Sequence, residues 1–261
     1  MKFISSDSPT ISAYRQQLYQ QLTAPIDGMW EQLYIANANV FLIRQHDQTL
    51  GYCCIDENKC LNQLFLLEKF IALMDKVVGA LIDQEMIVMA HLSSNTPVAF
   101  NACLFHAKSV QTNTFCFLHP NQPMETDFSM ALSPVWEDEI PAIKVFFKEQ
   151  VGMDDNFGYT QNLVDRKEIY RIMEGGSIIA TSECRLSDTQ PTYADLGMIV
   201  HHQHRGKGIA TQILKTQVNR VLAMGRKPIC STTYDNIASR RAIEKAGFYC
   251  AHIIFDINFK A

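Results

Sequence analysis

Residues 205–210 form the segment of the chain whose types and spacing best suit the binding of phosphate. The segment reads RGKGIA, and it follows an apolar stretch that ends at Val200. It opens a predicted helix, and the first turn of a helix carries backbone N–H groups without internal partners and partial positive charge. The glycines remove Cβ atoms that would keep a phosphate away from these N–H groups. Arg205 and Lys207 can add positive charge, so we expect a diphosphate to bind here.

Two familiar phosphate-binding motifs do not fit this segment. A Walker-type loop reads G-x-x-x-x-G-K-[ST], but position 201 is a histidine and Lys207 precedes a glycine. A dinucleotide fingerprint reads G-x-G-x-x-G, but position 211 is a threonine and the segment comes late in its half of the chain. The segment therefore predicts a different class of diphosphate ligand.

A strand and a helix must hold this segment in place. The strand is predicted at Leu196–Val200 and the helix at Lys207–Met224, with Gly225 ending the helix in the left-handed conformation. The apolar residues of one helix face recur at helical spacing. They are Ile209, Ile213, Val218, Val221 and Leu222.

The same order of predicted elements occurs on both sides of a linker, His119–Pro134, which contains three prolines. Each half has a hairpin, a strand, a long helix, a further strand, a polar turn with an asparagine and a β-rich tail. In the first half the hairpin is predicted at 40–44 and 51–55, the next strand at 61–67, the helix at 71–81, the further strand at 86–90 and the tail at 114–118. In the second half the hairpin is predicted at 168–173 and 177–186, the next strand at 196–200, the helix at 207–224, the further strand at 228–233 and the tail at 249–259. We interpret this order as one α/β fold present twice, in domains 1–127 and 128–261. Two unrelated α/β units of similar rhythm would give the same pattern.

Composition and charge argue against several classes of protein. Residues 1–127 carry 7 Lys/Arg against 12 Asp/Glu, a net charge of −5, and residues 128–261 carry 16 against 15, a net charge of +1. Neither half has the basic excess of a nucleic-acid binder. No apolar run is long enough to span a bilayer and no signal peptide is evident, so we expect a cytoplasmic protein that does not bind membranes. The 8 cysteines form no C-x-x-C pair, which favours buried thiols over a zinc site.

At this point the second half resembles the GNAT superfamily of N-acetyltransferases. The family signature Arg/Gln-x-x-Gly-x-Gly/Ala between a strand and a helix is matched by Arg205, Gly208 and Ala210. A second family pattern follows the next strand. It is matched by Asn236, Ser239, Lys245, Gly247 and Phe248. The resemblance covers residues 178–259 well and residues 135–167 less well. It implies two tandem GNAT-like domains, each a mixed, mostly antiparallel sheet flanked by helices.

The resemblance also implies a co-substrate, an acyl-CoA, with acetyl-CoA the expected one. Its pantetheine arm would lie where the strand ending in Met198, Ile199 and Val200 separates from the next strand. The diphosphate would be held by the main chain of the glycine-rich segment, and two residues would line the far side of the site. The implied segment comprises Arg205, Gly206, Lys207, Gly208, Ile209 and Ala210, and the far side comprises Asn236 and Ser239.

The resemblance leaves the residues that transfer protons open. Many family members use a tyrosine on the helix after the asparagine to protonate the leaving thiolate, but this position is Ile243 here. Tyr234, Tyr193 or water could replace it. Asp195 and Glu183 are the nearest carboxylates that could accept the proton of an incoming ammonium group. Each of them could equally be a solvated carboxylate without a catalytic role.

Two further features of the sequence, a group of histidines and the corresponding segment of the first half, add no residue to the predicted site. His201, His202 and His204 occupy the turn before the glycine-rich segment, and we predict no metal there because no other ligand lies nearby in the sequence. The first half has Glu68 and Lys69 where the second half has its glycines. If the first half shares the fold, we expect it to lack the phosphate site and to shape the acceptor pocket or to pack against the second half.

The sequence thus predicts an acyl-CoA-dependent N-acyltransferase that transfers the acyl group directly to a primary amine in a ternary complex. The acceptor could be a polyamine, an amino acid, an aminoglycoside or a protein N-terminus, and a homodimer is compatible with the sequence. One alternative is a non-catalytic acyl-CoA sensor or regulatory protein, which the isoleucine at position 243 favours. Another is an interaction module in which the first half recruits a partner protein.

Overall fold

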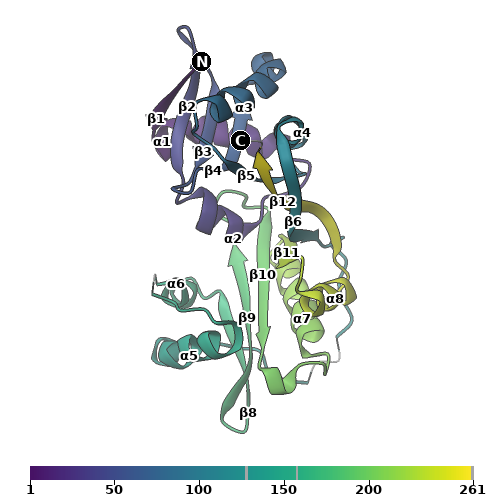
Figure 1. Ribbon diagram of the computed structural model, residues 1–261. Coiled ribbons are helices and arrows are strands. Elements are labelled where there is room, and N and C mark those ends of the chain that lie inside the picture. Colours follow the sequence, from purple (N-terminus) through teal and green to yellow (C-terminus); the bar gives the residue numbers. More distant parts are fainter. Residues whose placement is uncertain (127–128, 157, 260–261) are drawn as a thin grey trace. The chain divides into compact units, whose positions relative to one another are not determined.

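The computed structural model describes residues 1–126, 129–156 and 158–259, and they form two compact units. Unit 1 comprises Met1–Cys116 together with Ala251–Ala261, and unit 2 comprises Phe117–Cys250. Figure 1 shows the elements of both units in the colours of the sequence. The predicted boundary between residues 127 and 128 lies outside the described residues.

Unit 1 is built on a mixed sheet with the strand order β1-β2-β3-β4-β5-β12-β6. The strands β1 to β4, and β12 with β5, pair antiparallel, whereas β4 and β5 pair parallel. The strands are β1 (Lys2–Ser6), β2 (Asn39–Gln45), β3 (Gln48–Ile55), β4 (Cys60–Leu66), β5 (Met89–Ser93), β6 (Ala107–Leu118) and β12 (Tyr249–Phe259).

Helices cover both faces of this sheet. On one face, α1 and residues 28–35 bury Ile11, Leu18 and Trp30 against the strands. On the other face, α3 and α4 bury Val77 and Ala102. The helices are α1 (Ser8–Gln21), α2 (Gly28–Trp30), α3 (Met74–Asp83) and α4 (Pro97–Phe105).

Unit 2 has a sheet with the strand order β11-β10-β9-β8-β7. All neighbouring strands pair antiparallel except β10 and β11, which pair parallel. The strands are β7 (Ser133–Pro134), β8 (Ile169–Glu174), β9 (Ser177–Leu186), β10 (Tyr193–Val200) and β11 (Lys227–Thr233). The helices are α5 (Ile140–Val151), α6 (Tyr159–Asp165), α7 (Ile209–Ala223) and α8 (Ile237–Lys245).

The helices α6 and α7 lie on opposite faces of this sheet. Gln217 of α7 donates a hydrogen bond to Ser182, whereas Tyr159 of α6 donates one to the next residue, Glu183. Successive side chains of a strand point to opposite faces, so the two helices cover different sides of β9. On the α7 side, Ile209 and Ile213 pack with Val200 in a buried cluster.

In each unit the two parallel strands separate partway along their length. The pairing of β10 with β11 runs from Tyr193 to Asp195, although β10 continues to Val200 and β11 to Thr233. The pairing of β4 with β5 likewise ends at Leu61 and Ala90. Because the strands are parallel, their carboxyl ends lie at the same edge, and each unit therefore has an opening there.

The predicted α/β class, with a mixed and mostly antiparallel sheet in each half, is confirmed. The order of elements holds in both halves, but two elements of the first half are shifted. The strand predicted at 86–90 is β5, at Met89–Ser93, and the helix predicted at 71–81 is α3, at Met74–Asp83 after a 3-10 turn from Glu68 to Leu73. The last strand is predicted as part of the second domain, whereas β12 from Ile254 to Asn258 pairs with β5 of unit 1.

Within the described ranges, no helix is both long and apolar enough to cross a bilayer.

Candidate acyl-CoA site

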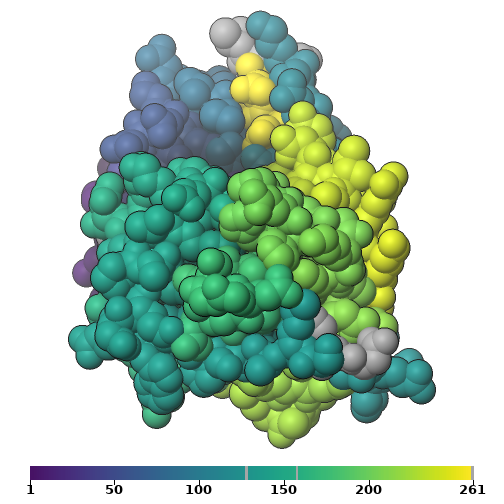
Figure 2. Space-filling model, turned by 90° about the horizontal axis from the view of Figure 1, so that it is seen from below, coloured from purple at the N-terminus to yellow at the C-terminus, as the bar shows by residue number. Residues whose placement is uncertain are grey.

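Unit 2 contains a groove of about 620 Å³ at the carboxyl end of β10. Three segments line it, namely the end of α5, residues 198–211, and α8 with its N-cap. Figure 2 shows this end of unit 2, with α5 in teal, the residues around the glycine-rich segment in green and α8 in yellow. The groove brings together all but one of the residues predicted to bind the co-substrate. They are Met198, Ile199, Val200, Arg205, Gly206, Gly208, Ile209, Ala210, Asn236 and Ser239, and Lys207 is not among the lining residues.

Two glycines give the loop before α7 its shape. Gly206 has φ 77° and Gly208 has φ 81°, and both lie in the left-handed region that disfavours side chains. A Cβ at either position would meet no other atom within 4 Å, so the space beside each is open. Gly208 is the N-cap of α7, a helix of 15 residues, and the unpartnered N–H groups of its first turn therefore lie at the groove.

The Arg205 side chain is directed at the backbone that flanks the groove. Its Nε donates to the carbonyl oxygen of Val200 at 3.0 Å, and its Nη2 donates to the carbonyl oxygen of Gln150 at 3.1 Å. The Gln150 side chain in turn accepts a hydrogen bond from the backbone N–H of His202 at 2.8 Å. Arg205 therefore holds the loop against both β10 and α5. The sequence predicts only a positive charge at this position.

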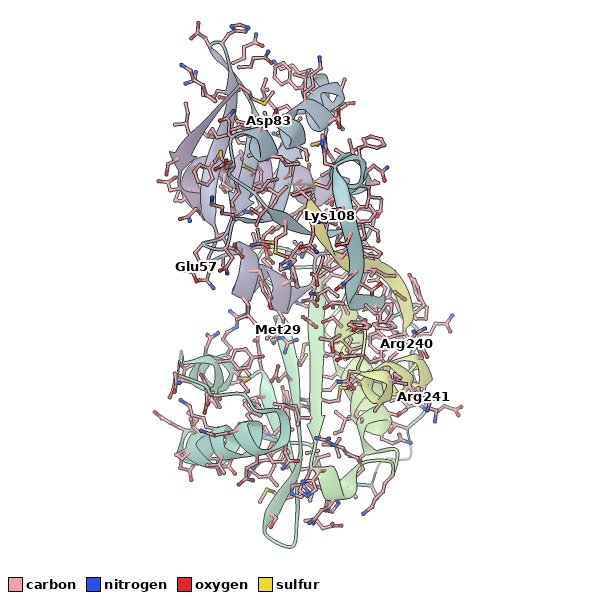
Figure 3. All side chains as sticks on the ribbon, viewed as in Figure 1. Met29, Glu57, Asp83, Lys108, Arg240 and Arg241 are labelled. Atoms are coloured by element: carbon pink, nitrogen blue, oxygen red, sulfur yellow. The ribbon has the colours of Figure 1, made fainter. Side chains whose placement is uncertain are left out.

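The helix α8 closes the other side of the groove with positive charge. The Asn236 side chain caps the helix by accepting from the Ser239 N–H at 3.1 Å. Arg241 and Lys245 lie one turn apart and both line the groove, whereas no aspartate or glutamate does so among the described residues. Figure 3 shows Arg240 and Arg241 extending from α8. The groove therefore combines a helix N-terminus with three side-chain cations, Arg205, Arg241 and Lys245, which suits a ligand of several negative charges.

The predicted proton acceptors, Glu183 and Asp195, belong to a buried network around Arg185. Arg185 Nη1 contacts Glu183 Oε2, and Arg185 Nη2 lies 3.1 Å from Asp195 Oδ2. The Tyr159 hydroxyl donates to Glu183 Oε2 at 2.6 Å. Burial alone would lower the pKa of Arg185, but attraction to Asp195, Tyr159 and Glu183 raises it well above its ordinary value. The Arg185 guanidinium thus forms ion pairs with two carboxylates.

This network lies directly beside the part of β10 that faces the strand opening. A Cβ on Gly197 would come within 3.1 Å of both Glu183 Oε2 and Arg185 Nη1. Gly197 immediately precedes Met198, the first residue of β10 that lines the groove. The absence of a side chain at position 197 therefore allows the charged network to reach the strand backbone.

Neither tyrosine candidate is among the described residues that line the groove. Tyr234 follows β11, is 58% exposed and is not among the groove-lining residues. Tyr193 begins β10, and the 8 residues of that strand place it about 23 Å from Val200. Ile243, at the position where many family members have tyrosine, is fully buried in α8.

The three histidines lie against one another at the turn before the loop. The rings of His201 and His202 are 4.3 Å apart, and His204 Nδ1 lies 3.6 Å from Glu174 Oε2. The pKa of His201 is lowered, mainly by partial burial and to a smaller extent by repulsion from His202, His204 and Arg205. No cluster of His, Cys, Asp and Glu in the described part of the chain has the arrangement of a metal site.

Unit 1 lacks the glycine-rich loop at the corresponding place. A 3-10 turn, Glu68–Leu73, leads from β4 directly into α3. No residue of this turn has a positive φ, and Glu68 would repel a phosphate.

Comparisons with known proteins agree with this arrangement. A family model described as "Acetyltransferase (GNAT) domain" matches residues 7–120, and one described as "Acetyltransferase (GNAT) family" matches residues 132–248. The comparison with curated proteins gave no match.

Several solved structures resemble the whole chain. An acetyltransferase of the GNAT family from Colwellia psychrerythraea is 27% identical, with full coverage of both chains and a TM-score of 0.93. A GCN5-related N-acetyltransferase from Sphaerobacter thermophilus is 15% identical, with coverage of 98% and 95% and a TM-score of 0.70. A tandem GNAT protein from the clavulanic acid biosynthesis pathway is 13% identical, with coverage of 99% and 98% and a TM-score of 0.65. The chain therefore belongs to the GNAT family of acetyltransferases and carries two GNAT domains in tandem.

Proposed function

We propose that unit 2 is an acyl-CoA-dependent N-acyltransferase, with acetyl-CoA as co-substrate and a primary amine as acceptor. The observation that carries this proposal is the groove at the carboxyl end of β10. It joins the N-terminus of α7 to Arg241 and Lys245 and has room for an extended ligand. Unit 2 makes up most of the predicted second domain, residues 128–261, and unit 1 makes up most of the predicted first domain, residues 1–127.

In this proposal the loop binds the diphosphate of the co-substrate. The N–H groups around Gly206, Gly208 and Ile209 donate to phosphate oxygens, and Arg241 and Lys245 supply charge from α8. The pantetheine arm enters the opening between β10 and β11 and pairs with the backbone of Met198–Val200. The acyl end then lies near Gly197, because the strands begin to separate after Asp195.

Transfer requires the amine nitrogen to attack the thioester carbonyl carbon while both substrates are bound. The C–N bond forms and the C–S bond breaks, so CoA leaves as a thiolate. A backbone N–H of β10 beside the thioester carbonyl stabilises the negative charge that develops on its oxygen. Orientation within the ternary complex supplies much of the acceleration.

The proposed proton acceptors are the carboxylates beside Gly197. Glu183 and Asp195, with Arg185, make a network of net charge −1, which favours a cationic amine beside Gly197. One of these carboxylates, directly or through water, accepts the ammonium proton. Tyr234 is the proposed donor to the thiolate, through solvent because it does not line the groove.

The test is release of CoA thiol from acetyl-CoA in the presence of amines of each class, namely a polyamine, an amino acid, an aminoglycoside and a peptide with a free N-terminus. We expect at least one class to support turnover that depends on amine concentration. Glu183→Gln should lower kcat without changing the KM for acetyl-CoA. Binding of acetyl-CoA without turnover on any amine would instead support a sensor or regulatory protein.

A further inference from the structure

Unit 1 contains a cavity of its own at the point where β4 and β5 separate. The cavity is about 30 Å³, which exceeds the space needed by one water molecule. The recorded pairs of these strands end at Leu61 and Ala90, so Asn62 and His91 are the next residues on either side of the opening. Gln63 pairs with Cys54 of β3 and Leu61 pairs with Ile55, which leaves Asn62 as an extra residue in a β-bulge.

Two amide groups in this cavity have N–H donors without partners. Asn62 and Gln63 are each 4% exposed, and neither Asn62 Nδ2 nor Gln63 Nε2 makes a hydrogen bond among the described residues. The orientation of the Gln63 amide is fixed, because its Oε1 accepts from the Tyr52 hydroxyl at 2.7 Å and from Arg15 Nε at 3.4 Å. Buried polar groups are normally hydrogen-bonded, so these two donors indicate an acceptor atom in the cavity.

His91 contributes a third polar atom of the opposite kind. Its Nε2 lies 3.1 Å from Asp256 Oδ1 and must carry the proton to donate to this carboxylate. Burial lowers the pKa of His91, although the charge of Asp256 opposes this shift. The ring is therefore neutral at pH 7, and its Nδ1, which also has no partner in the described ranges, presents a lone pair.

The charge of the lining limits the ligand further. Among the described residues, no lysine or arginine lines the cavity, and the one acidic side chain that does, Asp27, accepts from the Trp30 N–H at 2.8 Å. An anion would therefore lie near a carboxylate without a compensating cation, which is costly in a buried site. Apolar side chains form the remaining wall. They include Leu18, Trp30, Ile35, Leu92 and Ile254.

We propose that this cavity in unit 1 binds the uncharged carboxamide group of a small ligand. The carbonyl oxygen accepts from Asn62 Nδ2 and Gln63 Nε2, the amide N–H donates to His91 Nδ1, and a methyl group packs against Trp30. An N-acetyl group has this chemistry and size. Such a group is carried by the product of the proposed amine acylation, and only this link to the reaction rests on the proposed function.

The test uses acetamide as the probe and the full chain as the protein. Nuclear magnetic resonance follows the side-chain amide signals of Asn62 and Gln63 during titration at pH 7. We expect both signals to shift and saturate with acetamide, at about millimolar affinity, and acetate to bind at least tenfold more weakly. Asn62→Ala should weaken binding about tenfold, as expected for one hydrogen bond to a buried group. Asn58→Ala, in the exposed turn before β4, should bind like the wild type.

Either of two results would overturn the proposal. One is the absence of saturable shifts with acetamide, which would mean that the cavity holds only water. The other is equal binding of acetamide and acetate to the wild-type protein, which would show that the cavity does not select an uncharged ligand. This comparison needs no variant. The titration measures binding to unit 1, whereas thiol release measures turnover. Failure of the carboxamide proposal can therefore be distinguished from failure of the proposed function.

Discussion

Replacing Arg185 by methionine should destabilise unit 2 strongly, and increasingly so as the pH rises. Methionine keeps much of the volume of the side chain but removes the cation that Glu183 and Asp195 share. Glu183 is 7% exposed and Asp195 is 2% exposed, so neither carboxylate can turn to solvent without rearrangement of the sheet. The variant must either keep uncompensated buried charge or take up protons.

The size of the effect follows from this burial. Removing one partner from a buried ion pair costs about 3–5 kcal/mol, because the remaining charge is left uncompensated. In the variant the folded-state pKa of each carboxyl rises above its unfolded value near 4. A carboxyl with a raised folded-state pKa loses stability as the pH rises above the unfolded value. The deficit should therefore be small near pH 4 and approach the full amount near pH 7.

The assay is hydrogen exchange of peptides from β9 and β10, because it reports the free energy of opening for unit 2 separately from unit 1. The matched control is Arg240→Met, which removes an exposed arginine paired with Glu244 at 2.9 Å and should cost about 0.5 kcal/mol or less. Adding Glu183→Gln to Arg185→Met should restore part of the loss at pH 7. A deficit equal to that of Arg240→Met, or one that does not change between pH 4 and pH 7, would refute this reasoning.

Three further predictions concern other parts of the chain. Burial lowers the pKa of His252 to about 4, so unit 1 should keep the full stabilising contribution of the neutral ring above about pH 6.5 and lose about 3 kcal/mol of stability as the pH falls to 4. Hydrogen exchange of β5 should show a smaller loss of stability over this pH range in His252→Gln than in the wild type. Lys245→Ala should weaken acetyl-CoA binding about two- to fivefold and reduce its salt dependence in calorimetry, whereas Arg240→Ala on the same helix should change neither. Tyr234→Phe should lower kcat about a hundredfold if the hydroxyl is the proton donor, and an unchanged kcat would assign this step to water.

The glycine-rich segment could be predicted from sequence because its signal is local. A strand, a turn with two glycines and a helix are specified within about fifteen consecutive residues, and the structure has all three in that order. The additional groove residues of α8 also had a local signal. Ala238, Arg241, Ala242 and Lys245 are spaced three and four residues apart along the helix and therefore share one face.

Other parts of the site depend on contacts that no local pattern encodes. Glu183 and Arg185 share a strand face by their spacing of two, but the third member, Asp195, joins them only through the register that sets Arg185 opposite Asp195. Gln150 reaches Arg205 across 55 residues of sequence. The pairing of β12 with β5 likewise joins strands that are more than 150 residues apart, so apolar alternation predicted the strand but not its partner.

The most direct test of the proposed acyl-CoA site is calorimetric titration of acetyl-CoA into the wild type, Gly208→Val and Gly225→Val. Both glycines have a positive φ and open space around the Cβ position, so the two substitutions impose similar backbone strain at opposite ends of α7. Only Gly208 lines the groove, and loss of two hydrogen bonds to charged oxygens, at about 1.5–3 kcal/mol each, should weaken binding at least about a hundredfold. We predict that the wild type and Gly225→Val bind alike and that Gly208→Val does not bind measurably. Equal binding by all three proteins, or none by the wild type, would contradict the account.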